Sequence, residues 1–194
     1  GDYLALAQER GLDVAGIEFN AQGVALANAK VGGGRVRHGT VDTVDLRAFA
    51  PFDACALFDV IEHVQDPRAF LAKVSGALKP GALLHVVTPS LDSWSAKLLG
   101  NRWMEFKPEH LYYFNEGNLA ALLKGAGFGR LQVRPNYKIL NFQYIGRHMR
   151  TYPVPGFSAL WRVLESLLPA ALTRKNFRIV ASGMSVIAEK GAAP

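Results

Sequence analysis

The stretch FDACALFDVIEHVQDP, residues 52–67, is followed closely by LKPGALLHVVTP, residues 78–89. Each contains a near-continuous apolar run, which is typical of a strand buried on both faces of a sheet. Between these runs, Asp66-Pro67 begins a helix with an apolar stripe, and Lys79-Pro80-Gly81 ends it. The sequence here predicts a strand, a crossover helix and a second strand, which is the unit of a parallel sheet.

The same alternation continues on both sides of this unit. Asn20 is predicted to cap a helix that runs to Lys30. Further helices are expected at 3–10 and 116–124, and strands at 14–18, 36–38, 52–58, 82–88, 130–134 and 180–189. Strands that alternate with helices at short spacing indicate an α/β fold, in which helices cover both faces of the sheet.

The composition, 49% apolar and 20% charged, fits a single globular domain over residues 1–194. A lone cysteine, Cys55, cannot form an intramolecular disulfide, so we expect a cytoplasmic protein. No uncharged apolar run is long enough to span a bilayer, and the first residues lack the pattern of a signal peptide. We therefore expect neither a membrane span nor a cleaved leader.

The charge is distributed unevenly along the sequence. Residues 1–127 contain 12 Lys and Arg against 14 Asp and Glu, whereas residues 128–194 contain 10 against 2. A basic last third favours an anionic partner, which could be an acidic metabolite, a phosphorylated lipid surface or a nucleic acid. Solvated surface charge without any partner is the alternative.

Two long segments lack the character of a simple turn. Residues 90–114 are rich in loops, and we expect them on the substrate side of the sheet. Residues 136–176 exceed what a hairpin needs, and their arginines alternate with Phe142, Tyr144, Tyr152, Phe157 and Trp161. This segment is interpreted either as a helical insertion packed on the domain or as a lid over the carboxyl ends of the strands, where such sheets bind ligands.

Three places in the sequence resemble the class I S-adenosylmethionine-dependent methyltransferases. The linked stretches 52–67 and 78–84 are similar to the family's motifs around its fourth strand, with Ala82 in place of a second glycine. Glu18 ends an early strand, where the family has an acid that binds ribose. Residues 103–128 are similar to a segment of one bacterial branch. The resemblance implies a Rossmann-like, doubly wound, mostly parallel sheet with an antiparallel last strand.

The sequence departs from that family at its start. The glycine-rich loop after the family's first strand is missing except for Gly1, which matches the last glycine of the loop. Because the first strand is central in the family, we expect a gap in the sheet with unpaired backbone groups beside it. We also expect the native polypeptide to begin upstream of Gly1.

The resemblance implies S-adenosyl-L-methionine as cofactor and places its contacts at the ends of successive strands. Glu18 is expected to accept hydrogen bonds from both ribose hydroxyls. Phe19 and Val41 are expected to contact the adenine, and Thr40 to add a hydrogen bond. The remaining residues expected beside the methionine part of the cofactor are Gly1, Phe58, Asp59 and Val60.

Two histidines are candidates for the general base that a hydroxyl acceptor requires. We expect His110 first and His63 second, because imidazole titrates near neutral pH and both residues fall in loops at the same end of the sheet. The alternative is a structural role, with His63 capping a helix and His110 orienting the aromatic residues that follow it. Asp59, Glu62 and His63 also resemble a metal-binding pattern of some methyltransferases, yet we predict no metal here.

The function that the resemblance implies is methylation of a small-molecule acceptor, at a hydroxyl of an acidic or phosphorylated metabolite or of an envelope precursor. RNA methylation is an alternative, although no dedicated nucleic-acid module is present and the Asn/Asp-Pro-Pro-aromatic pattern of amino-methylating enzymes is replaced by Thr88-Pro89-Ser90. A second alternative is an inactive binding protein on the same fold. A nicotinamide-dependent oxidoreductase would share only the acid at the strand end.

Overall fold

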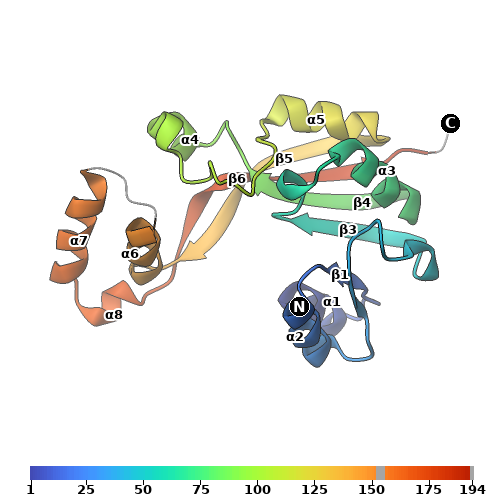
Figure 1. The fold of residues 1–194 in the computed structure, drawn as a ribbon, viewed down its shortest axis with the longest axis horizontal. Coiled ribbons are helices and arrows are strands. Elements are labelled where there is room, and N and C mark those ends of the chain that lie inside the picture. The colour runs from blue at the N-terminus through green and yellow to red at the C-terminus, as the bar shows by residue number, and fades with distance from the viewer. Residues whose placement is uncertain (152–155, 193–194) are drawn as a thin grey trace.

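The computed structural model describes residues 1–151 and 156–192 and confirms the predicted α/β class (Figure 1). Tyr152, which we assigned to the aromatic segment, lies outside the described residues. The strands are β1 (Gly16–Glu18), β2 (Val36–His38), β3 (Phe52–Phe58), β4 (Leu78–Pro89), β5 (Phe128–Leu140) and β6 (Phe177–Lys190). The helices are α1 (Asp2–Glu9), α2 (Ala21–Val31), α3 (Pro67–Ala77), α4 (Trp94–Leu99), α5 (Glu116–Gly125), α6 (Phe142–Thr151), α7 (Phe157–Leu167) and α8 (Ala170–Thr173).

The strands form two sheets. β1 and β2 pair in parallel, and the other four strands form a sheet of order β3-β4-β6-β5. In this second sheet β3 is parallel to β4, and β6 is antiparallel to both of its neighbours. The antiparallel last strand is therefore confirmed, and every other strand of that sheet runs in one direction. The division also matches the expected gap, since β3 has a strand partner only on its β4 side among the described residues.

The helix starts follow the predicted local signals. The Asn20 side chain accepts hydrogen bonds from the backbone of Gln22 and Gly23, and Asp66 does the same for the first turn of α3, with Pro67 at its start. Each cap satisfies amide groups that have no partner within the helix. These two helices begin directly after β1 and shortly after β3, so the caps also fix the chain at the carboxyl ends of those strands.

The main core lies between the four-stranded sheet and the helices α3 and α5. Its fully buried side chains come from one side of β4 and β6 and from the facing stripes of the helices, and include Leu71, Leu84, Leu119, Leu123 and Ala188. A smaller separate core joins α1 and α2 to β1 and β2 through Val14, Ala27, Val31 and Val36. The two cores correspond to the two sheets.

The prediction that residues 52–58 are buried on both faces is wrong for this structure. Within β3 only Leu57 is fully buried, because the strand is an edge of its sheet. Cys55 is half-buried, and burial raises the pKa of its thiol to about 11. The thiol of Cys55 is therefore protonated near neutral pH and unsuited to act as a nucleophile.

β5 and β6 are longer than predicted. β4 ends its pairing with β6 at Pro89 and Gly183, whereas β5 and β6 continue together to the pair Leu140 and Phe177. Residues 136–140, which we assigned to the insertion, are therefore strand. The helices α6, α7 and α8 sit at the end of this two-stranded extension and project from the body of the molecule (Figure 1). β5 leaves the sheet at the same end as β3 and β4.

Candidate cofactor and acid–base site

Glu18 is held at the carboxyl end of β1. Its carboxylate accepts a hydrogen bond of 2.8 Å from the backbone N–H of Asn20, and its carbonyl accepts one of 3.1 Å from Gly39. The first turn of α2 packs directly on this side chain, since a Cβ at Gly23 would lie 2.9 Å from Cγ of Glu18. The glycine thus permits the close approach of helix and carboxylate, and Glu18 is half-buried in a defined position.

Parallel pairing brings the ends of β1 and β2 together. Glu18 is the register partner of His38, so Phe19 and Thr40 leave the sheet at the same edge. A ring nitrogen of His38 lies 2.9 Å from the carbonyl oxygen of Phe19 and fixes that residue. The Phe19 side chain is 77% exposed, whereas Thr40 and Val41 are half-buried. An aromatic side chain so exposed next to a held carboxylate offers a surface for a flat ligand.

Gly1 and the end of β3 both lie against the N-terminal helices. A Cβ at Gly1 would lie 2.7 Å from Cα of Ala27, so the start of α1 packs tightly on α2. Tyr3 of α1 contacts Phe58 edge to face at a centroid distance of 4.8 Å. The structure therefore brings the end of β3, where Phe58 is partly exposed, close to the N-terminal helix.

Asp59 and Val60 follow β3 in an unusual conformation. The φ of Asp59 is 51°, in the left-handed region that non-glycine residues rarely adopt. Its N–H donates to the carbonyl of Val87 on β4 at 2.9 Å, and its side chain is exposed. Strained residues of this kind often mark ligand sites. Here the turn directs the chain into the short helical turn Ile61–His63.

Three side chains converge just beyond that turn. Glu62 is 1% exposed and His110 is 8% exposed, although both are polar. The Thr88 hydroxyl donates to Oε2 of Glu62 at 2.9 Å, while Oε1 of Glu62 and Nδ1 of His110 are buried without a hydrogen-bond partner among the described residues. The exposed ring of His63 lies edge to face with His110 at 4.8 Å, and its Nδ1 bonds the Glu109 carbonyl at 2.8 Å.

Burial controls the protonation of this cluster. Desolvation raises the pKa of Glu62, and the hydrogen bond from Thr88 opposes this shift only in part. Desolvation lowers the pKa of His110, and the neighbouring His63 lowers it further. His110 is therefore a neutral imidazole near neutral pH, with an unpartnered Nδ1 that can accept a proton.

The same three residues have the donor set of a metal site. One ligand atom from each of Glu62, His63 and His110 lies within 4.8 Å of the others, whereas Asp59 of the predicted pattern is not part of this group. One carboxylate and two imidazoles suit a borderline metal such as zinc better than magnesium. The expectation that no metal is bound stays a prediction, and no step below depends on a metal.

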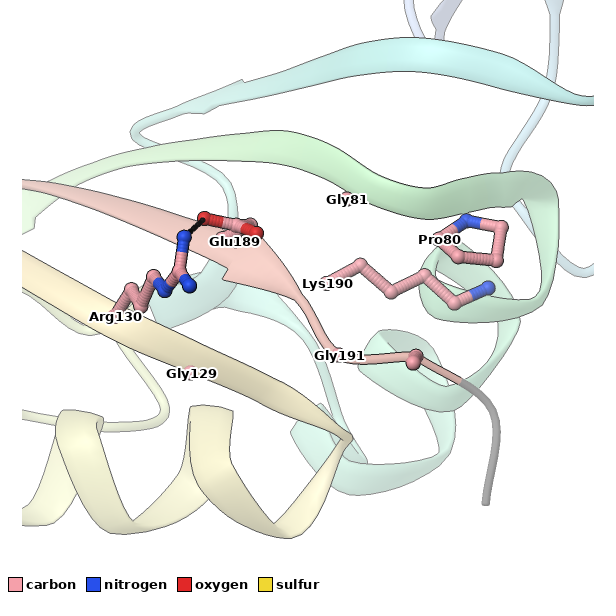
Figure 2. A pocket seen from close by; sticks show the side chains of 8 residues that line it. Pro80, Gly81, Gly129, Arg130, Glu189, Lys190 and Gly191 are labelled. Atoms are coloured by element: carbon pink, nitrogen blue, oxygen red, sulfur yellow. Dashed lines mark hydrogen bonds and ion pairs between the residues drawn. The ribbon is translucent and has the colours of Figure 1, made fainter.

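A pocket at the opposite end of the sheet does not belong to this site. It lies between the start of β4, the start of β5 and the end of β6 (Figure 2). Arg130 pairs with Glu189 at 3.2 Å, and the Lys190 ammonium donates to the carbonyls of Ser75 and Leu78. Its charged groups are thus occupied by the protein itself.

Comparison with known proteins identifies the family. The model of a family described as "Methyltransferase domain" matches residues 1–133. The chain belongs to this methyltransferase family. The part that matches includes Glu18, the end of β3 and the cluster of Glu62, His63 and His110. The helices α6–α8 lie outside it.

Relatives and solved structures agree with this assignment. The methyltransferase chain is 30% identical over 115 residues to a Mycolicibacterium smegmatis protein named "Probable S-adenosylmethionine-dependent methyltransferase", covering 59% of this chain and 43% of that protein. It is 28% identical over 116 residues to a ubiquinone biosynthesis O-methyltransferase of Maricaulis maris, covering 56% and 46%. The chain thus spans less than half the length of these relatives. A solved SAM-dependent methyltransferase of Archaeoglobus fulgidus has the same fold, with a TM-score of 0.62 at 18% identity over 98% of this chain and 81% of that one.

The sequence did not predict how Glu62 and His110 come together in this chain. Glu62 was expected only as part of a metal-like pattern, and the end of the strand at Thr88 was considered only for the absence of an amino-methylation motif. The backbone N–H groups of Leu111 and Tyr112 donate to the Glu62 carbonyl at 2.8 and 3.2 Å, and this places His110 beside the acid. The only signal in the sequence was that Glu62 follows the strand β3 and His110 follows the strand β4. Parallel strands end at the same edge of a sheet, so the two segments could be expected near each other.

Replacing Glu62 by Gln is expected to stabilise the folded protein near neutral pH. Burial raises the pKa of Glu62 in the folded state above 4.5, its ordinary value, so the folded state holds this proton more tightly than the unfolded state. The wild type is therefore less stable once the pH has risen above the pKa of Glu62 in the folded state. Gln has no such ionisation and retains an oxygen for Thr88. We expect a gain of about 1–3 kcal/mol in the free energy of unfolding near pH 7, measured by urea denaturation, and a smaller gain near pH 4.5. Glu109→Gln, at an exposed position of the same loop, should show no such difference.

Proposed function

We propose that this chain is an S-adenosyl-L-methionine-dependent methyltransferase that methylates a hydroxyl group of a small, anionic acceptor. The observation that supports this most strongly is a pair of features, each of which follows the carboxyl end of a parallel strand. The carboxylate of Glu18, held by a backbone hydrogen bond, lies next to the exposed ring of Phe19 after β1. The buried, neutral His110 lies beyond the end of β3. The first suits a nucleoside, and the second suits a hydroxyl that must lose a proton.

The cofactor, when bound, supplies a methyl group that a sulfonium makes electrophilic. The residues after β1 and β2 would hold it: Glu18 would accept hydrogen bonds from the ribose hydroxyls, and Phe19 and Val41 would contact the adenine. The Thr40 hydroxyl already accepts a hydrogen bond from the N–H of Asp42 at 3.2 Å, which leaves its own proton free to be donated to the ligand. Gly1 and the turn at Phe58, Asp59 and Val60 would lie beside the amino-acid end.

The proposed chemical role of the protein is to align the acceptor and remove one proton. His110 would accept the proton of the acceptor hydroxyl, and the oxygen would then take the methyl group that the cofactor supplies while the carbon–sulfur bond of the sulfonium breaks. The buried acid Glu105 favours the protonated product state, because its charge and a backbone hydrogen bond oppose the lowering of the His110 pKa. His63, which is exposed and contacts His110 edge to face, is the second candidate for the base.

The anionic character of the acceptor is supported by charge and by similarity. The last third of the chain has 10 Lys and Arg against 2 Asp and Glu, and β5 leaves the sheet toward α6–α8 at the same end as the cluster. The relatives named for ubiquinone biosynthesis are O-methyltransferases, which agrees with a hydroxyl acceptor.

The test measures transfer of labelled methyl from the cofactor by the full-length protein to matched acceptors. A phenolic carboxylate or phosphate should be methylated faster than its neutral ester, and an RNA oligonucleotide should not be methylated. Methylation of RNA alone would contradict the small-molecule proposal. Cofactor binding without transfer to any acceptor of the panel would instead favour a binding protein on this fold.

A further inference from the structure

The helix α7 has one face packed on the protein and one face that is not. Trp161 stacks on Phe142 of α6 at a centroid distance of 5.5 Å, and Glu165 pairs with Arg150 of α6 at 3.1 Å. Glu165 also lies against Gly146, where a Cβ would collide with the carboxylate. These contacts fix α7 on α6 through the side that carries Trp161 and Glu165.

The opposite side of α7 is an apolar face made of Leu160, Val163, Leu164 and Leu167. Their spacing of three and four residues places them along one stripe of the helix. The exposed fractions of Leu160, Val163 and Leu167 are 56%, 56% and 75%, and Leu172 of α8 is 46% exposed. A stripe of this kind normally packs against something, and within the described residues nothing covers it.

The surroundings of this apolar face are strongly basic. Residues 136–178 contain seven Lys and Arg against a single acid, Glu165, and that acid is already paired with Arg150. Arg162, Arg174 and Lys175 are exposed. The apolar face of α7 therefore lies within a region of positive charge. The extension of β5 and β6 holds the helices α6–α8 beyond the rest of the sheet (Figure 1).

We propose that α6–α8 bind the surface of an anionic lipid bilayer, with the apolar face of α7 inserted at the level of the headgroups. Aliphatic residues on one side and basic residues around them are what an interfacial helix requires. A second copy of this chain would bring the same positive charge against itself, and a nucleic acid would use aromatic stacking rather than leucines. No described helix is long and apolar enough to cross a bilayer. It does not depend on the proposed methyl transfer.

The test is co-sedimentation of the full-length protein with vesicles of phosphatidylcholine, with and without phosphatidylglycerol. Binding is expected only to the anionic vesicles, and it should weaken as salt is added because the charges are screened. Leu160→Gln with Leu167→Gln should lower this binding at least fivefold. The matched control is Leu12→Gln with Leu26→Gln, which changes two similarly exposed leucines of the N-terminal helical region and should leave binding unchanged.

A second pair of variants tests the charge. Arg162→Gln with Arg174→Gln should weaken binding and reduce its dependence on salt, whereas Arg10→Gln with Arg68→Gln should do neither. Thermal unfolding of all variants should match the wild type, since every changed side chain is exposed. Equal binding to neutral vesicles, or no binding to anionic ones, would overturn the proposal. So would self-association in sedimentation velocity that the leucine pair abolishes, because that result assigns the apolar face to a second copy.

Discussion

The Glu18→Ala variant is expected to bind S-adenosylhomocysteine at least tenfold more weakly than the wild type, a loss of about 1.4 kcal/mol. The carboxylate is fixed by the N–H of Asn20 and by the close approach of Gly23, so it meets a ligand without first being ordered. Removing it leaves two ribose hydroxyls without acceptors in a half-buried place. Isothermal titration of the full-length protein measures the effect.

Two further variants make this result specific. Asp13→Ala removes an exposed acid that pairs with Arg35 just before β1, and it should leave the affinity unchanged. Gly23→Ala keeps the carboxylate but forces Cγ of Glu18 to move from its position, so it should weaken binding by an intermediate factor. Equal affinity of wild type and Glu18→Ala would remove the cofactor site from the end of β1.

Features set by neighbouring residues could be predicted from the sequence. In the caps at Asn20 and Asp66, a side chain accepts hydrogen bonds from amides two and three residues away. Such a cap can be predicted from the local sequence because it does not depend on residues elsewhere in the chain. The strand at Val36–His38 was predicted with its observed bounds, since the three glycines 32–34 form a turn just before it. The antiparallel last strand came from resemblance to a family rather than from any local signal.

Features set by distant contacts could not be predicted. β5 was expected to end before Pro135, because proline cannot donate to a sheet. The structure instead has a register shift between Pro135 and Tyr137, and the strand continues with β6 beyond it. The burial of Glu62 likewise depends on residues far along the chain, since Leu111 and Tyr112 bind its carbonyl and Thr88 its carboxylate.

His110→Gln is expected to lower kcat by about 100- to 10,000-fold, the range for loss of a general base. The amide is similar in size to imidazole and can keep polar contacts, but it cannot take up a proton. The cofactor should bind to this variant with unchanged affinity, because the residues that we propose to hold it follow β1, β2 and β3. A fall in kcat without a fall in affinity separates a chemical role for His110 from a structural one.

The pH dependence distinguishes His110 from His63. Because burial and then His63 lower the pKa of His110, the acid limb of kcat/KM should lie at a lower pH than for an ordinary histidine, whose pKa is 6.5. In His63→Gln one source of this lowering is gone, so the acid limb should move toward higher pH while kcat on the plateau is retained. If His63→Gln abolishes transfer and His110→Gln does not, the base is His63, and the buried ring only orients the loop that carries it.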